Sequence, residues 1–125
     1  MFIKSDGDRR ICGGAFIELQ FCRLENGTPI EEIVAVDSIS HWKSDSLYVE
    51  DENEFCNEYG RIFDCGTYNN LQTGGVDPYG INYYSPKQTE TALKRILEAK
   101  PKEYCQIFEW LSGAVKYNGF YILGI

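Results

Sequence analysis

The sequence contains little of what most catalytic and metal sites are made of. Its 125 residues include one histidine, His41, and one methionine. A single histidine excludes metal sites built from several histidines, and it leaves a cysteine–histidine pair as the one nucleophilic arrangement that uses histidine. No cysteine stands beside His41 in the sequence. We therefore predict no catalytic residue, no metal site and no cofactor.

Two motifs that bind phosphates or ions are also missing. Gly74 and Gly75 are not followed by the Lys-Ser/Thr pair that a phosphate-binding loop requires. A calcium loop that started at Asp51 would need an oxygen ligand where Phe55 stands and a glycine where Cys56 stands. The sequence has 19 acidic residues, so paired carboxylates that hydrolyse a substrate stay open as the least favoured alternative.

Long apolar runs are absent. No run approaches the ~20 residues that cross a bilayer, and residues 1–8 lack the apolar segment of a secretory leader. The five cysteines form no closely spaced pair, which is typical of reduced thiols used as small core residues. We expect a cytoplasmic protein with one globular domain over residues 1–125 and no membrane partner.

The negative charge is concentrated in one third of the chain. The net charge is −7, which argues against direct binding of nucleic acid. Residues 31–64 contain ten acidic and two basic residues, whereas the rest of the chain is nearly neutral. This contrast favours an acidic surface that binds a basic partner.

The C-terminal segment 117–125 predicts the centre of the fold. Five of its last six residues are apolar, which is typical of a strand that is buried on both faces. Asn118-Gly119 is expected to end a preceding helix. Two helices come before it, one that starts at Ser85-Pro86 with Gln88 closing a capping box, and one after Pro101. We predict an α+β fold with an antiparallel or mixed sheet and these two helices on one face.

The first half of the chain is harder to interpret. Apolar residues alternate with Glu18 and Gln20 from Ala15 onward, which predicts a half-buried strand. Asn26-Gly27 then favours a hairpin that returns as a strand over 30–37. A helix that starts at Thr28-Pro29 is the competing interpretation. Further strands are predicted at 2–4, 47–49 and 81–84, with a helix from Asp51 to Gly60 and an irregular stretch over 67–80.

Four segments carry a resemblance to a known family: 45–49, 59–63, 80–86 and 117–125. Together they resemble small immunity proteins of bacterial polymorphic toxin systems, including those of contact-dependent growth inhibition. The resemblance implies a cytoplasmic, non-enzymatic protein that binds the toxin of its own system and blocks its active site or substrate surface. It transfers no site residue, because such families share no catalytic residues.

We expect the toxin to be basic and to be a nuclease, because an acidic surface complements a cleft that holds phosphate. The alternative is a non-enzymatic regulatory module that binds another protein. The acidic residues predicted to bind the partner lie within 14 positions: Asp45, Glu50, Asp51, Glu52, Glu54 and Glu58. Trp42, Tyr48 and Tyr68 are added as aromatic anchors. If these acids are not the contact surface, the 67–80 segment is the next candidate.

Overall fold

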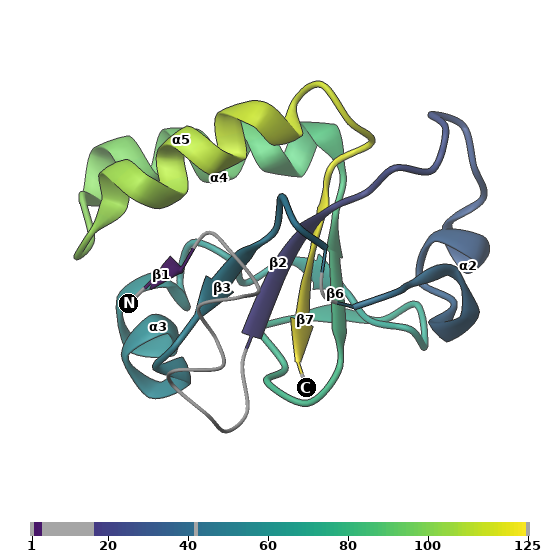
Figure 1. Ribbon diagram of the computed structural model, residues 1–125, viewed down its shortest axis with the longest axis horizontal. Helices are drawn as coiled ribbons and strands as arrows, with labels where there is room; N and C mark the ends of the chain where they lie inside the picture. The colour runs from purple at the N-terminus through teal and green to yellow at the C-terminus, as the bar shows by residue number, and fades with distance from the viewer. Residues whose placement is uncertain (1, 4–16, 42, 125) are drawn as a thin grey trace.

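A computed structural model describes residues 2–3, 17–41 and 43–124 of the protein. These residues form a seven-stranded antiparallel sheet with helices on both faces (Figure 1). The strand order is β1-β3-β2-β7-β6-β4-β5. The strands are β1 (Phe2–Ile3), β2 (Ile17–Phe21), β3 (Leu47–Val49), β4 (Gly66–Thr67), β5 (Thr73–Gly74), β6 (Ile81–Tyr84) and β7 (Phe120–Gly124). The helices are α2 (Ile30–Ile33), the 3-10 turn η1 (Val36–Ser38), α3 (Glu52–Tyr59), α4 (Pro86–Ala99) and α5 (Tyr104–Ala114).

Strand β7 lies in the middle of the sheet, as its composition predicts. It pairs with β2 on one side and with β6 on the other, and residues 120–123 are buried. Gly119 precedes it with a φ of +82°, and a Cβ there would lie 1.9 Å from the carbonyl oxygen of Tyr84. Only glycine fits this position, both because of its positive φ and because of the close approach of β6.

The two faces of the sheet bury different kinds of side chain. We call the face that carries Leu19 and Ile122 the helix face, because α3, α4 and α5 pack on it. We call the face that carries Glu18 and Leu123 the α2 face, because residues of α2 and its flanks cover it. The α+β class and the position of the two C-terminal helices on one face are confirmed.

Helices α4 and α5 begin and pack largely as predicted. The Ser85 hydroxyl accepts from the Gln88 amide at 3.2 Å, and the Gln88 side chain accepts from the Ser85 amide at 2.8 Å. Ala92 and Ile96 of α4 face Ile107 and Leu111 of α5 in one apolar core. Leu97, near the C-terminal end of α4, and Val115, at the C-cap of α5, are exposed apolar residues. None of the helices in the described residues is long and apolar enough to cross a membrane.

Strand β2 is buried on both faces, so the prediction of a half-buried strand is wrong. Glu18 and Gln20 are buried, as is Leu19 between them. The alternation of residue types is real, but the segment between β2 and β3 covers the polar face as well. The polar residues are accommodated by hydrogen bonds rather than by water.

The predicted strand over 30–37 is also wrong. Residues 30–33 are helical, in agreement with the competing interpretation, although Thr28 makes no capping bond to this helix and donates instead to the Glu25 carbonyl at 2.6 Å. The Asn-Gly turn forms, with Gly27 at a φ of +91°. It joins no paired strands because β3 and β7 already occupy both edges of β2, where Leu19 pairs with Leu47 and Ile122.

The predicted irregular stretch over 67–80 is partly regular. Strands β4 and β5 form a short hairpin at the edge of the sheet, and Tyr68 lies across it with its hydroxyl 2.6 Å from the Gly75 carbonyl. The remaining residues, 75–80, form the connection to β6. The predicted strands at 47–49 and 81–84 and the helix after Asp51 are confirmed.

Four buried tyrosines lead us to predict how the stability of the fold changes at alkaline pH. Burial raises the pKa of Tyr59, Tyr83, Tyr84 and Tyr121 well above the usual range, because the charged phenolate is disfavoured away from water. Tyrosines of the unfolded chain ionise near pH ~10. The folded state therefore binds more protons above that pH, and the free energy of unfolding should fall as the pH rises beyond it.

Urea unfolding followed between neutral and strongly alkaline pH tests this prediction. The Tyr84→Phe variant should lose about 1 kcal/mol at neutral pH, from the hydrogen bond to the Phe63 carbonyl, and should show a shallower alkaline decline. Tyr79→Phe is the matched control because the Tyr79 ring is exposed. An alkaline decline of equal slope in both variants would contradict the assignment to buried tyrosines.

Candidate functional site

The acidic run after β3 is largely engaged within the protein. Asp51 caps α3 by accepting from the Glu54 amide at 3.0 Å, as predicted. Glu54 forms an ion pair with the Lys102 ammonium at 2.5 Å, and Glu58 accepts from the Lys102 amide at 2.7 Å. The hydrogen bond that the Lys102 ammonium donates to the Glu54 carboxylate raises the pKa of Lys102. These acids hold the α4–α5 turn against α3.

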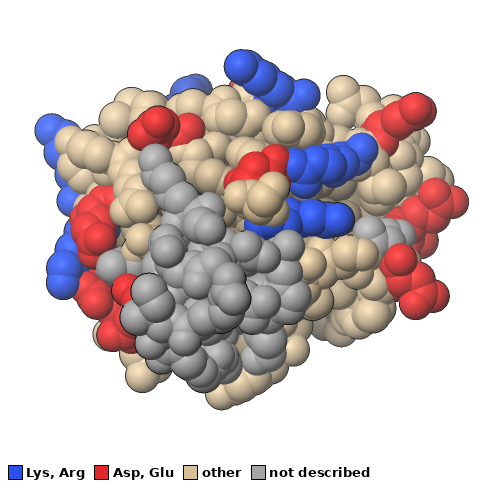
Figure 2. Space-filling view, in the orientation of Figure 1, with Lys and Arg blue, Asp and Glu red and all other residues tan. Residues whose placement is uncertain are grey.

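Other acids of the 31–64 segment are paired with bases from outside it. Asp45 forms an ion pair with Arg23, and Asp64 forms one with Arg95. Figure 2 shows basic and acidic side chains side by side at the left-hand end, whereas acidic side chains dominate the right-hand edge, where α2 lies. The acidic third of the sequence is therefore not one acidic surface. Glu50 is exposed and Glu52 is half-buried, and their contact with a partner stays a prediction.

The structure describes two of the three predicted aromatic anchors, and they differ in burial. Tyr48 is fully buried and donates its hydroxyl to the Lys43 carbonyl at 2.6 Å, so its assignment as a partner contact is wrong. It is buried because it lies opposite Glu18 on the covered α2 face. Tyr68 is half-buried, and its hydroxyl is bonded to Gly75. Trp42 lies outside the described residues.

The most unusual polar group is Glu18, in the middle of the sheet. Its side chain is fully buried, and one carboxylate oxygen accepts from the Ser46 hydroxyl at 2.6 Å, the Lys43 amide at 3.1 Å and the Gln20 side chain at 3.2 Å. The other oxygen lies 3.5 Å from Nδ1 of His41. The buried carboxylate of Glu18 thus fixes the loop between η1 and β3. It also orients His41, which belongs to this loop.

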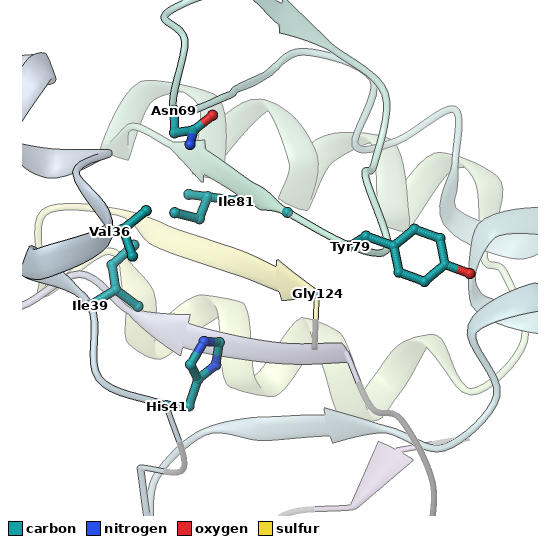
Figure 3. Close-up of a pocket in the computed structure, with 8 residues that line it drawn as sticks. Val36, Ile39, His41, Asn69, Tyr79, Ile81 and Gly124 are labelled. Carbon is teal, nitrogen blue, oxygen red and sulfur yellow. The ribbon is translucent and has the colours of Figure 1, made fainter.

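His41 lines a pocket on the α2 face. The pocket has a volume of about 280 Å³ and lies where β7 ends and β6 begins. Its lining residues come from four segments of the chain: Val36, Ile39, His41, Asn69, Tyr79, Gly80, Ile81 and Gly124. Figure 3 shows Val36, Ile39 and Ile81 close together, with His41 below Ile39 in the view, Asn69 above Ile81 and the Tyr79 ring turned away. The walls are apolar, and the polar groups lie toward opposite ends.

The connection between β5 and β6 forms one rim of this pocket. The buried Asn82 side chain accepts from the Asp77 amide at 2.9 Å and donates to the Gly75 carbonyl at 3.1 Å. Asp77 in turn accepts from the Tyr79 amide at 2.9 Å. The turn then packs so closely on β7 that a Cβ at Gly124 would lie 2.2 Å from the Pro78 carbonyl oxygen. The rim is therefore fixed by hydrogen bonds and by close packing.

Two residues that line the pocket, and one on the hairpin beside it, expose large apolar side chains. Val36 is 64% exposed and Tyr79 is 79% exposed, and both line the pocket. Leu71 is 46% exposed at the tip of the hairpin that contributes Asn69. We call the pocket together with Val36, Leu71 and Tyr79 the pocket face. Exposed apolar side chains beside a recess favour contact with another molecule.

The residues around His41 bear on what chemistry the pocket could support. No serine, threonine or cysteine is among its described lining residues, so His41 has no nucleophile beside it there to activate. In addition, no three potential metal-ligating side chains come together among the described residues. What the arrangement offers is a shaped apolar recess with a few fixed polar groups, which is suited to binding.

Sequence reasoning missed the pairing of Glu18 with His41. The two residues are 23 positions apart, and Glu18 occupies the position in an alternating strand that usually faces water. No spacing pattern signals their contact. The 67–80 segment is the alternative site predicted from the sequence, and its residues Asn69, Tyr79 and Gly80 line the pocket.

The chain matches no family model, no curated protein and no solved structure. The functional assignment therefore rests on the chemistry of the surface.

Glu18 is predicted to be a structural requirement of the site. Glu18→Ala should lower the free energy of unfolding by about 3 kcal/mol, because three buried donors would lose their acceptor. His41→Ala should cost less than about 1 kcal/mol, because the ring is partly exposed. Urea unfolding measures both values. Equal losses in the two variants would contradict the role of Glu18 as the anchor of this loop.

The acids of α3 give a second stability prediction. Glu58→Ala should cost about 1 kcal/mol because the Lys102 amide loses its acceptor, whereas Glu52→Ala should change stability by less than about 0.5 kcal/mol. Both changes remove one carboxylate from the same helix, so the comparison separates a specific bond from net charge. Thermal or urea unfolding of the two variants measures the loss of stability in each. Equal losses in the two variants would refute the structural role of Glu58.

Proposed function

We propose that this chain is an immunity protein that binds a protein toxin and blocks it without catalysis. The observation that carries the proposal is the pocket face, where the exposed residues Val36 and Tyr79 line a recess and the exposed Leu71 lies on the hairpin that contributes Asn69. Large apolar and aromatic side chains supply most of the binding energy at protein interfaces. A recess with a hydrogen-bonded rim and exposed apolar side chains beside it suits a tight inhibitor better than it suits turnover of a substrate.

We place the contact surface on the pocket face rather than on α3. The α3 acids Glu54 and Glu58 already bind Lys102, so a partner would have to compete with bonds within the protein. Around the pocket, Asp37 follows the exposed Val36, and α2 carries the exposed Glu31 and Glu32. Charges at the edge of an interface guide association, and apolar anchors at its centre hold the complex together. This surface therefore supports a basic toxin as the partner.

A nuclease is the toxin class that this charge favours. An enzyme that holds phosphate presents basic residues around its cleft, and an acidic inhibitor is complementary to such a cleft. A regulatory module would use the same kind of surface, but it would bind its partner without protecting a cell from a toxin.

Growth of a bacterial host tests the proposal. The protein encoded beside this chain should arrest growth when it is expressed alone, and co-expression of this chain should restore growth. Tyr79→Ala should weaken the purified complex by at least about 2 kcal/mol, roughly 30-fold in affinity, because it removes an exposed aromatic anchor.

Leu97→Ala is the matched control. Leu97 is an exposed apolar residue of α4, outside the pocket face, and its loss should change affinity by less than about twofold. Calorimetric titration measures both variants. Binding without growth protection would favour the regulatory module, and equal effects of the two variants would move the interface away from the pocket face.

A further inference from the structure

Leu71 has a backbone conformation that leucine rarely adopts. Its φ is +71°, in the left-handed region, where a Cβ lies too close to the backbone carbonyl oxygen. Glycine and asparagine are the usual residues there, and a bulky residue at positive φ is rare. Among the described residues, Lys100 and Glu103 are the other two non-glycine residues with positive φ, and they flank the turn between α4 and α5. Leu71 is the apolar one of the three.

Hydrogen bonds within the β4–β5 hairpin hold Leu71 in this conformation. The Tyr68 amide donates to the Gln72 carbonyl at 2.8 Å, and the Leu71 amide donates to the Tyr68 carbonyl at 3.0 Å. The Asn70 side chain accepts from the Gln72 amide at 3.0 Å. The Tyr68 ring packs on β5, since a Cβ at Gly74 would lie 2.5 Å from its hydroxyl oxygen. A strained residue persists only where its surroundings fix it in this way.

The fold makes little use of the Leu71 side chain. Leu71 is 46% exposed and belongs to neither of the apolar cores that the described residues form. Residues 69–73 around it are all exposed. Packing within the protein therefore does not offset the strain at this position. A strained conformation that holds an apolar side chain in water is a reason to look for a contact outside the protein.

The hairpin also lies in an uncharged part of the chain. Residues 65–76 include no acidic or basic residue, although 25% of the whole chain is charged. The residues beside Leu71 at the tip are amides instead: Asn69, Asn70 and Gln72. Amide side chains both donate and accept hydrogen bonds and carry no charge. A surface complementary to this tip is apolar at its centre and polar but uncharged around it.

We infer that Leu71 inserts into an apolar recess on the partner protein, with uncharged polar groups of the partner facing the amides of the hairpin tip. The inference rests on the proposed function and adds one central contact and the chemistry that the partner surface must have there. Acidic residues elsewhere guide the approach of a basic partner, whereas this contact depends on shape and on burial of the leucine.

Thermal unfolding tests the strain without the partner. Leu71→Asn should raise the midpoint by about 3 °C, because asparagine tolerates the left-handed conformation. Leu97→Asn is the matched control, because it makes the same change at a residue that is 49% exposed but lies in α4. It should lower the midpoint by about 2 °C, because asparagine is a poorer helix former than leucine. A midpoint that falls in both variants would overturn the inference.

Calorimetric titration with the protein encoded beside this chain tests the contact. Leu71→Asn should weaken binding at least about tenfold although it stabilises the fold, and Leu97→Asn should change affinity less than about twofold. Leu71→Met keeps an apolar side chain and should bind within about threefold of the wild type. The loss in Leu71→Asn should be the same in about 50 mM and about 500 mM salt, because no charge is removed. Wild-type affinity in Leu71→Asn would overturn the inference, and so would equal losses in Leu71→Asn and Leu71→Met.

The outcome for this contact can be distinguished from the outcome for the immunity function. If Leu71→Asn binds the toxin and protects cells as the wild type does, the inference is overturned while the immunity function stands. If the wild-type chain binds the neighbouring protein without protecting cells, and Leu71→Asn weakens that binding, the immunity function is overturned while the inference stands.

Discussion

Burial of the two central strands on both faces is the constraint on which the rest of the structure depends. Strands β2 and β7 form the middle of the sheet, and neither presents a side to water. A sheet of this kind needs cover above and below. Helices α3, α4 and α5 supply the cover on one face with a large apolar core, and the segment from Cys22 to Ser46 supplies it on the other with a smaller one.

The thinner cover of the α2 face explains why the candidate site lies there. α2 has only four residues, and η1 has three, so this segment crosses the sheet without closing over its end. The recess that remains is lined by the strand ends themselves. Its floor is formed by the paired ends of β6 and β7, and its rim is fixed by Asn82 and by the packing of Pro78 on Gly124. A preformed recess of this kind loses little conformational entropy when it binds.

The buried Glu18 links the fold to the site. A carboxylate in the centre of a sheet is costly unless its oxygens are satisfied, and here the donors come from the loop that the carboxylate fixes. The same loop carries His41 to the pocket. One residue therefore stabilises the cover of the α2 face and determines how the imidazole is presented.

The sequence by itself determined the elements whose signals are local: the doubly apolar strand β7, the Ser85–Gln88 capping box, the cap at Asp51, and hence the α+β class. It did not determine that Glu18 and Gln20 are buried, that residues 30–33 are helical, or that the α3 acids bind Lys102. Those outcomes depend on which segment occupies each sheet edge and face. The pocket has the same origin, because its residues, from Val36 to Gly124, meet only when β6 and β7 pair. Strand pairing is a competition between distant segments for backbone hydrogen bonds, and no local pattern of residues records its result.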